Sequence, residues 1–310
     1  MPDGFRAIGT FTPRHRNFVM PWEKPYPTVI FPHGFLIPLV CARLSAHSER
    51  DFAEQPRMLS RIKSVVQKGI ANTSLEPHLR RAWGKVAALR TVDDTLTEKI
   101  LARVVDRTAD CIDVGCHVGM VVDRILSLAP DGQHDAFEPL PHYAAFLTKK
   151  YRYRANVRVH GIALSDRNGF ADFTYNRDHP DYSGFLQREY PSTAHHLETI
   201  RVKTARLDDL IDPRRKVKLI KIDVEGAELG TLRGAFELLS RDRPTVIFEH
   251  GLGAADYYDT TPEQIFDLLA EARLHVYLLQ NFLSDRRRLT RDAFSEQYHR
   301  RLHHYFAAAG

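Results

Sequence analysis

From residue 111 onward the chain alternates short apolar runs with stretches of helical periodicity, and this alternation constrains its fold more than any other feature. Such alternation is typical of βαβ units, in which parallel strands form a sheet covered by helices. The apolar runs predict strands at residues 109–114, 133–138, 157–163, 217–223, 245–250 and 274–279. The intervening periodicity predicts helices at residues 119–128, 141–154, 227–240 and 262–272. We therefore expect an α/β fold with a mainly parallel sheet.

Two segments depart from this simple alternation. Apolar residues at 170–175 and 200–202 predict a β-hairpin-like insertion around the polar stretch 176–199, which we interpret as a lid with Gly184 as its pivot. Residues 303–308 are compatible with a final strand or with a helix that continues from Asp292. Thr261, Pro262 and Gln264 form the start signal of the last predicted helix, a capping box with proline at the first helical position.

The first part of the chain follows another pattern. About 50 residues rich in proline and aromatics precede a helical pattern at 54–105. We expect an N-terminal extension at residues 1–94, irregular and then helical, which covers the active site, and an α/β domain at residues 95–310.

Composition limits the class of protein. Hydrophobic residues make up 43% of the chain, as in ordinary globular proteins, and 44 basic against 39 acidic residues give a net charge of only +5. The arginines at 286–301 are interspersed with acidic residues, which favours a solvated surface over a nucleic-acid-binding patch. Three cysteines imply no disulfide framework, residues 1–16 lack an apolar signal core, and the most apolar run, 28–42, is too short to span a membrane. We expect a cytoplasmic protein.

The first motif with chemical meaning is a strand that enters a glycine turn and then a helix. It contains Asp113, Gly115, Cys116, His117 and Gly119. Glycine allows a sharp turn and close approach of a ligand to the backbone. The dinucleotide fingerprint G-x-G-x-x-G has a glycine where this chain has His117, so the turn suits a smaller adenosine ligand better than a pyrophosphate.

Two acidic positions follow at the ends of the next strands. Glu138 lies 25 residues after Asp113, where a carboxylate can accept bonds from both ribose hydroxyls; the alternative is a strand-end Glu before a helix that begins at Pro139. Ser165 and Asp166 lie where Asp166 can accept a bond from an exocyclic amine, or they simply begin a turn.

Further carboxylates collect after the fourth and fifth strands. Asp223, Glu225 and Glu228 lie within six residues, and Glu249 is followed by His250. Clustered carboxylates repel one another, so they point to general-base catalysis, a metal, or binding of an amine or hydroxyl. Glu228 is also explained by its place in the first turn of a helix. No H-E-x-x-H spacing is present, so no specific motif supports a metal.

Together these motifs resemble the FkbM-type methyltransferases, a class I family that uses S-adenosylmethionine. The resemblance covers about residues 95–310, and its most specific part combines Lys-Ile-Asp-Val-Glu-Gly-Ala-Glu at 221–228 with Arg-Pro at 243–244 and Glu249. It implies a Rossmann-like sheet of seven strands, the last antiparallel. It also implies O-methylation of a small-molecule acceptor, a hydroxyl on a sugar or secondary metabolite.

The resemblance also implies residue roles. Asp113, Gly115 and Gly119 line the methionine end of the cofactor, and Cys116 and His117 of the same turn, where the family usually has a small residue and Asn, are further candidates for cofactor binding. Glu138 holds the ribose, and Ser165 and Asp166 lie beside adenine. The acceptor faces Asp223, Glu225, Glu249 and His250.

For the transfer step we hypothesise that Asp223 or His250 takes the acceptor proton, while Glu225 and Glu249 bind the acceptor or a divalent ion such as Mg²⁺. Three alternatives stay open: an NAD(P)-dependent oxidoreductase on the same core, a non-catalytic S-adenosylmethionine-binding protein, and an RNA-binding protein.

Overall fold

The computed structural model describes residues 28–30, 36–38, 92–188, 196–300 and 304–310. The chain divides into two compact units, Met1–Ser60 and Arg61–Gly310. In the first unit, β1 (Thr28–Ile30) and β2 (Leu36–Pro38) pair antiparallel. The helical pattern expected at 54–91 and the boundary expected between residues 94 and 95 involve residues outside those described, so both stay predictions. No helix among the described residues is both long and apolar enough to cross a membrane.

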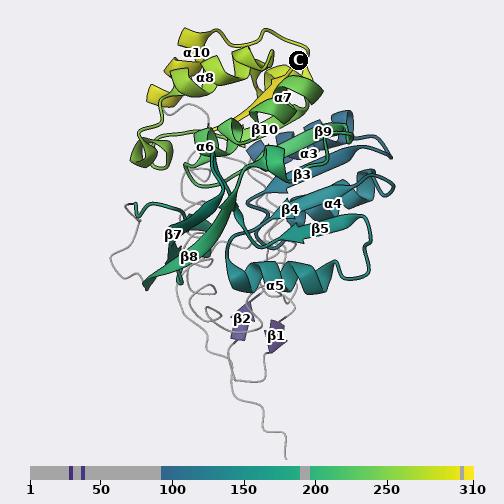
Figure 1. Ribbon diagram of the computed structural model, residues 1–310, viewed down its shortest axis with the longest axis vertical. Coiled ribbons are helices and arrows are strands. Elements are labelled where there is room, and N and C mark those ends of the chain that lie inside the picture. The colour runs from purple at the N-terminus through teal and green to yellow at the C-terminus, as the bar shows by residue number, and fades with distance from the viewer. Residues whose placement is uncertain (1–27, 31–35, 39–91, 189–195, 301–303) are drawn as a thin grey trace, which may run out of the picture. The chain divides into compact units, whose positions relative to one another are not determined.

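The second unit is built on a seven-stranded sheet with the order β11-β12-β10-β9-β3-β4-β5 (Figure 1). Its strands are β3 (Asp110–Val114), β4 (His134–Phe137), β5 (Val157–His160), β9 (Val217–Ile222), β10 (Thr245–Glu249), β11 (His275–Leu278) and β12 (Tyr305–Ala309). β12 pairs antiparallel with both β10 and β11, whereas the other neighbouring strands are parallel. The expected Rossmann-like fold, with its last strand antiparallel, is therefore confirmed. The C-terminal segment forms a strand rather than a continued helix.

Helices cover both faces of this sheet. One face carries α3 (Val92–Val104), α4 (Met120–Leu128), α5 (Pro141–Lys150) and α9 (Leu279–Leu283), and the other carries α6 (Glu228–Arg233), α7 (Phe236–Asp242), α8 (Pro262–Glu271) and α10 (Arg291–His299). The capping box at Thr261 and Gln264 is confirmed by two reciprocal hydrogen bonds of 3.4 and 3.0 Å.

One predicted helix is wrong in its extent. Residues 227–240 form two helices, α6 and α7, instead of one. The carboxylate of Asp208 accepts hydrogen bonds from the N–H groups of Glu237 and Leu238, at 3.1 and 2.9 Å, and so begins a new helix there. At the junction, a Cβ on Gly234 would overlap the carbonyl oxygen of Ser165, so the close packing requires glycine.

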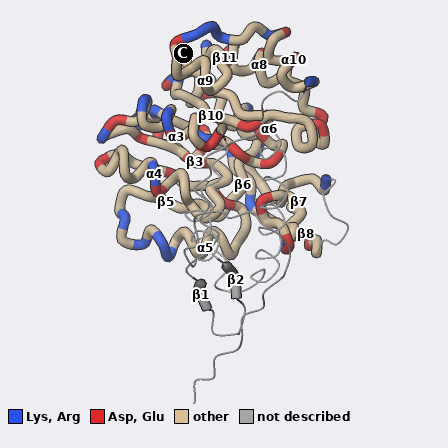
Figure 2. Tube along the Cα trace, turned by 180° about the vertical axis from the view of Figure 1, so that it is seen from behind, with Lys and Arg blue, Asp and Glu red and all other residues tan. Residues whose placement is uncertain are grey.

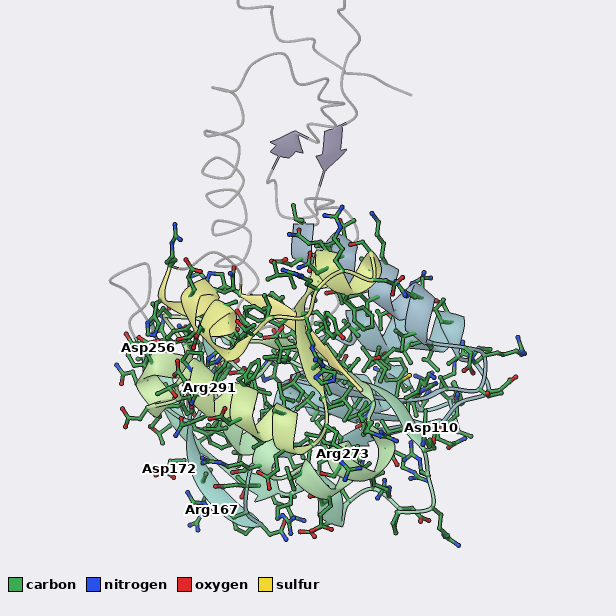
Figure 3. The ribbon with its side chains drawn as sticks, turned by 90° about the horizontal axis from the view of Figure 1, so that it is seen from above. Asp110, Arg167, Asp172, Asp256, Arg273 and Arg291 are labelled. Carbon is green, nitrogen blue, oxygen red and sulfur yellow. The ribbon has the colours of Figure 1, made fainter. Side chains whose placement is uncertain are left out.

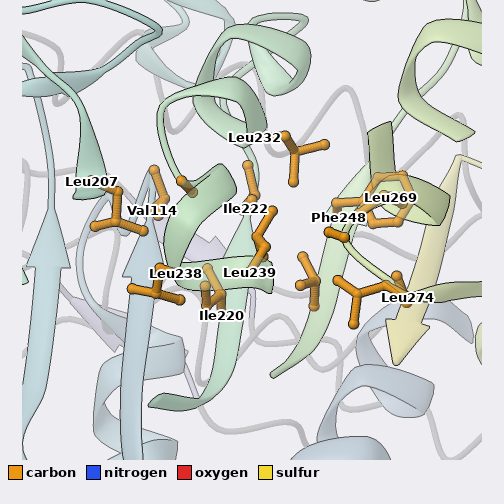
Figure 4. Packing of buried hydrophobic residues seen from close by; sticks show 14 of the residues in the cluster. Val114, Leu207, Ile220, Ile222, Leu232, Leu238, Leu239, Phe248, Leu269 and Leu274 are labelled. Carbon is orange, nitrogen blue, oxygen red and sulfur yellow. The ribbon is translucent and has the colours of Figure 1, made fainter. Parts of the chain in front are cut away.

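The core lies between the sheet and the second group of helices. Figure 4 shows Val114, Ile220, Ile222 and Phe248 of the strands in contact with leucines of α6, α7 and α8. Ile220 and Phe248 have no exposed surface. The strands β3, β9 and β10 are mostly buried on the other face as well, so most of their residues are apolar, although β3 contains Asp113 and β9 contains Lys221.

A second sheet of three strands contains β6 (Ala163–Leu164), β7 (Gly169–Asn176) and β8 (Leu197–Ala205). β7 and β8 pair antiparallel along their whole length, which confirms the predicted hairpin. The strand predicted at 157–163 is wrong in its extent: β5 ends at His160, and Ala163–Leu164 pairs with β8 instead. Gly161 and Ile162 lie between the two, so the chain changes sheets there. Arg167 and Asp172 mark the outer edge of this second sheet (Figure 3).

Charged residues of both signs alternate along much of the chain (Figure 2). Near the C-terminus, Arg291 pairs with Asp267 at 2.8 Å and Arg300 with Glu296 at 2.6 Å. These arginines therefore share their surface with acidic partners, as the sequence suggested.

An ion network with little exposure joins three strands. Arg215, just before β9, donates to Asp110 at 2.8 Å, to Asp135 at 2.6 Å and to the carbonyl oxygen of Gln133 at 2.9 Å. The Asp135 side chain is 2% exposed, and its other oxygen accepts from His160 at 2.8 Å. Without Arg215, Asp135 would lose its only guanidinium partner among the described residues while it stays buried.

We expect Arg215→Met to lower the free energy of unfolding by about 3 kcal/mol, because breaking a buried ion pair leaves a buried charge without compensation. Urea denaturation followed by circular dichroism measures this loss. The matched control is Arg214→Met, since the Arg214 side chain is 89% exposed and pairs only with Asp212. Equal midpoints for the two variants would contradict the prediction.

Candidate active site

The turn after β3 is packed directly against the end of β9. Gly115 has a φ of 75°, and a Cβ there would overlap the carbonyl oxygen of Asp223. The N–H groups of Gly115 and Cys116 both donate to the carbonyl oxygen of Phe137, at 3.0 and 3.1 Å. The turn is thereby fixed between β4 and β9, and glycine is required at position 115 for packing within the protein itself.

The end of the turn is fixed by α5. Gly119, with a φ of 75°, precedes α4, and its carbonyl oxygen accepts from Lys150 at 3.0 Å and from the Tyr151 hydroxyl at 2.9 Å. The Cys116 side chain is buried in a hydrophobic cluster that includes Leu147 and Tyr151. Burial raises the pKa of this thiol well above its usual range. Cys116 therefore offers its backbone, rather than a reactive thiolate, to the site.

Asp113, at the end of β3, is buried without a partner. It is 1% exposed, and among the described residues neither carboxylate oxygen has a hydrogen-bond partner of normal geometry. Burial raises the pKa of Asp113 to about 6, an effect that the nearby Lys221 and Lys150 offset only in part. A buried carboxylate of this kind favours a cationic or hydrogen-bonding ligand.

Glu138, one strand away, is 4% exposed but has partners. Its two oxygens accept from the N–H groups of His117, at 2.8 Å, and Leu140, at 2.9 Å. Burial raises the pKa of Glu138 to about 7 in spite of these bonds. His117 is held in a left-handed conformation, with a φ of 47°, and its Nε2 lies 3.2 Å from Asp181 Oδ1 in the insertion.

Ser165 and Asp166 lie elsewhere. The Ser165 backbone packs against Gly234 at the junction of α6 and α7, and its hydroxyl donates to Asp166 at 3.2 Å. The Asp166 side chain is 41% exposed and lies 3.7 Å from Arg167. The structure does not bring either residue into contact with Asp113 or Glu138, and their part in adenine binding stays a prediction.

At the end of β9, Asp223 is held by three donors. Its Oδ2 accepts from Lys221 and from the Tyr305 hydroxyl, both at 2.9 Å, and the Glu249 carboxyl also bonds to it. Burial alone would raise the pKa of Asp223, but Lys221 and these hydrogen bonds outweigh burial and lower it. Burial and the neighbouring acids raise the pKa of Glu249 well above its usual range. The pKa values of the two carboxyl groups are thus shifted in opposite directions, that of Asp223 downward and that of Glu249 upward.

Glu225 and Glu228 complete the acidic group. Glu225 has a φ of 57° and accepts a hydrogen bond from Arg188 of the insertion. Burial and the charge of Asp223 raise the pKa of Glu225 to about 8. Glu228, 1% exposed, accepts from the N–H groups of Val224 and Gly226 at 3.1 and 3.2 Å, so it fixes the turn between β9 and α6.

His250 is not part of this group. Successive strand side chains point to opposite faces of a sheet, so Glu249 and His250 face opposite ways. The His250 ring is 1% exposed and stacks on Phe294 and Tyr298 of α10, with centroid distances of 5.7 and 4.8 Å. Among the described residues its two nitrogens have no hydrogen-bond partner, and burial lowers its pKa to about 4. The structure separates His250 from the carboxylates with which the sequence grouped it.

Carboxylate oxygens of Asp223, Glu225 and Glu249 lie within 4.8 Å of one another, a spacing that a divalent ion would fit. Two cationic side chains already bond to this cluster, Lys221 to Asp223 and Arg188 to Glu225. Cationic side chains of the protein thus bond to two of the three carboxyl groups.

The insertion between β7 and β8 contacts the turn after β3 and also Tyr258, which follows β10. Besides the contact of Asp181 with His117, the N–H of Leu186 donates to the Tyr258 hydroxyl at 3.3 Å. The predicted pivot, Gly184, is paired with Thr174 by two backbone hydrogen bonds, at 2.7 and 3.1 Å, and a Cβ on it would lie 2.9 Å from Tyr258 Oη. Its observed role is close packing against Tyr258; whether the insertion moves as a lid stays a prediction.

Three residues of the site were missed by the sequence interpretation. Lys221 stands two residues before Asp223 on one strand, and a lysine inside an apolar run was a usable signal. Arg188 and Tyr305 carry no local signal, because they reach the site through long-range pairing of the insertion and of β12.

The main sheet is Rossmann-like, with a glycine turn after β3 and acidic residues at the ends of the adjacent strands. These features are typical of α/β enzymes that bind a nucleotide or a nucleoside-containing cofactor. Residues 113–277, more than half of the chain, match the model of the methyltransferase FkbM domain. The chain belongs to the FkbM methyltransferase family, which confirms the resemblance seen in its motifs. This membership favours a methyltransferase over the oxidoreductase alternative.

The chain is also similar to individual proteins over part of its length. The chain is 32% identical over 144 residues to 2-O-methyltransferase NoeI of Sinorhizobium fredii (strain NBRC 101917 / NGR234), covering 43% of this chain and 59% of NoeI. It is 27% identical over 176 residues to AMB antimetabolite synthetase AmbE of Pseudomonas aeruginosa, covering 45% of this chain and 8% of AmbE. The crystal structure of methyltransferase FkbM from Methylobacillus flagellatus KT superposes with a TM-score of 0.42 and 15% identity, over 66% of this chain and 44% of that one.

We expect His250 to make stability depend on pH. Its pKa of about 4 lies below the ordinary value near 6.5. Between these two pH values the imidazole is protonated in the unfolded chain but not in the folded chain. The stabilisation is complete above pH 6.5 and is lost as the pH falls towards 4, by on the order of 3 kcal/mol. Urea midpoints of His250→Phe should therefore depend less on pH in this window than those of wild type. The same pH dependence in both proteins would contradict this, and exposed His275→Gln serves as control.

Proposed function

We propose that this protein is an S-adenosylmethionine-dependent O-methyltransferase that methylates a hydroxyl of a sugar or secondary metabolite. The observation that carries the proposal is Asp113, a buried carboxylate with no hydrogen-bond partner of normal geometry among the described residues, beside a glycine turn and one strand away from a carboxylate cluster. Membership of the FkbM family and the likeness to a 2-O-methyltransferase support it.

The residues at the ends of β3 and β4 fit this cofactor. S-adenosylmethionine supplies an electrophilic methyl group on sulfur and carries a positively charged amino group and a ribose diol. Asp113 would accept from the amino group, which satisfies its two buried oxygens. Glu138, already ordered by two backbone N–H groups, would accept from the ribose hydroxyls. The side chain of His117, where a dinucleotide fingerprint has glycine, argues against close packing of a pyrophosphate.

The residues at the ends of β9 and β10 fit a neutral hydroxyl acceptor. Asp223 is ionised and adjoins the glycine turn, so it would take the hydroxyl proton as the methyl–oxygen bond forms and the methyl–sulfur bond breaks. Glu249 and Glu225 would bind the acceptor and align its oxygen, since positioning supplies much of the rate in such displacements. His250 is left out of this step because its ring lies on the opposite face of the sheet.

We further propose that the reaction needs no divalent ion, because Lys221 and Arg188 already compensate the cluster that Mg²⁺ would occupy. A cytoplasmic location is part of the proposal as well. Cys111 and Cys116 are free thiols, in keeping with a reducing compartment.

We expect calorimetry to detect binding of S-adenosylmethionine and S-adenosylhomocysteine but not of NAD. Asp113→Asn and Glu138→Ala should each weaken binding about tenfold or more, because each removes a charge-assisted hydrogen bond. Affinity should also fall below about pH 6, where Asp113 becomes protonated. Asp131→Asn, on an exposed loop, is the control. Binding of NAD in place of the adenosyl ligands would favour the oxidoreductase.

We expect Asp223→Asn to lower turnover about 100-fold or more while cofactor binding is retained, because the amide cannot accept the proton. Formation of S-adenosylhomocysteine with a panel of monosaccharides and phenols measures turnover, in EDTA and in Mg²⁺. Asp172→Asn, on the outer edge of the second sheet, is the control. Full activity of Asp223→Asn would remove Asp223 as the base, and activity that appears only with Mg²⁺ would contradict the metal-free reaction.

A further inference from the structure

The segment from the last turn of α5 to the start of β5 carries positive charge only. Residues 139–165 contain no Asp or Glu. Within residues 149–158, which we call the basic segment, Lys150 is paired with Asp123 at 3.0 Å. The other basic residues of the segment are exposed and have no carboxylate partner among the described residues: Lys149, Arg152, Arg154 and Arg158. The basic segment therefore presents charge that the rest of the described structure does not balance.

Hydrogen bonds fix the backbone of the basic segment. The N–H of Arg154 donates to the carbonyl oxygen of Tyr151 at 2.8 Å, and the N–H of Val157 donates to that of Arg154 at 3.0 Å. The Asn156 side chain donates to two carbonyl oxygens of the loop before β4, at 3.0 and 2.9 Å. The cations thus extend from tight turns that are attached to the main sheet, rather than from a free tail.

An aromatic ring lies open among these cations. Tyr153 is 84% exposed, the largest exposed fraction among the large hydrophobic side chains of the described residues. The guanidinium of Arg152 lies 4.3 Å from the centroid of its ring. Exposed aromatic rings and arginine guanidinium planes are the groups on which the bases of single-stranded nucleic acids stack.

Two ordinary explanations account for only part of the basic segment. The negative end of the helix dipole favours a cation in the last turn of α5, which explains Lys149 but not Arg154, beyond the helix. β5 is an edge strand of the main sheet, and a charge there, such as Arg158, opposes pairing with another chain. Neither explanation requires the open ring of Tyr153.

The surroundings of Tyr153 favour a nucleic acid over a membrane as the partner. An anionic membrane would also attract the cations, but membrane-bound surfaces insert large apolar side chains as well. Apart from Tyr153, the basic segment has no large hydrophobic side chain that is exposed. Three of its four unpaired cations are arginines, whose planar guanidinium groups can bind phosphate through two parallel bonds.

We propose that the basic segment is a docking surface for single-stranded nucleic acid, in which the cations bind phosphates and a base stacks on Tyr153. The segment enters β5 at the start of that strand, since Val157 pairs with His134 at the start of β4, whereas Glu138 follows the end of β4. The docking surface thus lies at the opposite end of these strands from the candidate active site. The inference goes beyond the proposed methyl transfer and does not depend on it.

The test measures the fluorescence anisotropy of a labelled oligouridylate of about 12 nucleotides with the full chain. We expect affinity to fall about tenfold between about 50 and 200 mM salt, because cations of the segment displace counterions from phosphates. Tyr153→Ala should weaken binding about fivefold or more and leave the salt dependence unchanged, since it removes stacking alone. The double variant Arg154→Gln, Arg158→Gln should weaken binding and also reduce the salt dependence.

The chain offers a matched control for each change. Phe170 on β7 is 64% exposed and also has a guanidinium, that of Arg201, 5.3 Å from its ring centroid, so Phe170→Ala is the control for the tyrosine. Arg291 and Arg300 are exposed arginines that are paired with acids, so Arg291→Gln, Arg300→Gln is the control for charge. Both controls should bind the oligonucleotide as wild type does.

Absence of binding by wild type at about 50 mM salt overturns the proposal, since phosphate contacts are strongest at low salt. Equal losses of affinity in Tyr153→Ala and Phe170→Ala overturn it too, as does an abasic oligomer of the same length that binds as tightly as the oligouridylate. Phosphatidylserine vesicles that bind more tightly than the oligouridylate, with the same dependence on Arg154 and Arg158, would assign the surface to a membrane instead. Calorimetry with S-adenosylhomocysteine tests the methyltransferase function separately.

Discussion

Burial of six carboxylates at the ends of four neighbouring strands is the constraint on which the site depends. Each loses solvation, and burial is the largest cause of the raised pKa of Asp113, Glu138 and Glu225. Such a group folds only if partners are brought to it from elsewhere. Lys221 comes from β9 itself, and distant segments bring Tyr305 from β12 and Arg188 from the insertion. These donors therefore link the antiparallel last strand and the second sheet to the centre of the main sheet.

The carboxyl groups are not all paired with cationic side chains. This difference separates the ends of β9 and β10 from the ends of β3 and β4. At the ends of β9 and β10, Lys221 and Arg188 bond to Asp223 and Glu225. At the ends of β3 and β4, Glu138 accepts from two backbone N–H groups, and neither oxygen of Asp113 has a hydrogen-bond partner of normal geometry among the described residues. Cationic side chains of the protein therefore compensate the carboxyl groups of the first two strand ends more directly than those of the second two.

Local patterns were enough to predict most strands of the main sheet and the hairpin insertion, because strand periodicity and turns depend on neighbouring residues. The seven-stranded sheet with its antiparallel last strand followed from the family resemblance, and the roles of the site residues stay predictions. The grouping of His250 with Glu249 failed for a reason that was also local: adjacent strand residues face opposite sides, so sharing a strand end does not mean sharing a site. Arg188 and Tyr305 were beyond reach, since their roles arise from pairing over long sequence separations. The division of helix 227–240 likewise depends on Asp208, which is remote in sequence.

The insertion joins parts of the site that come from different strands. Over one short segment it contacts the turn after β3 through Asp181 and His117, and the end of β9 through Arg188 and Glu225. Between these two contacts lie η1 (Pro180–Tyr182) and the backbone bonds of Gly184 to Thr174, which hold the segment against β7. Because one segment bonds to the ends of two neighbouring strands, the packing of the second sheet and the geometry of the candidate site depend on each other.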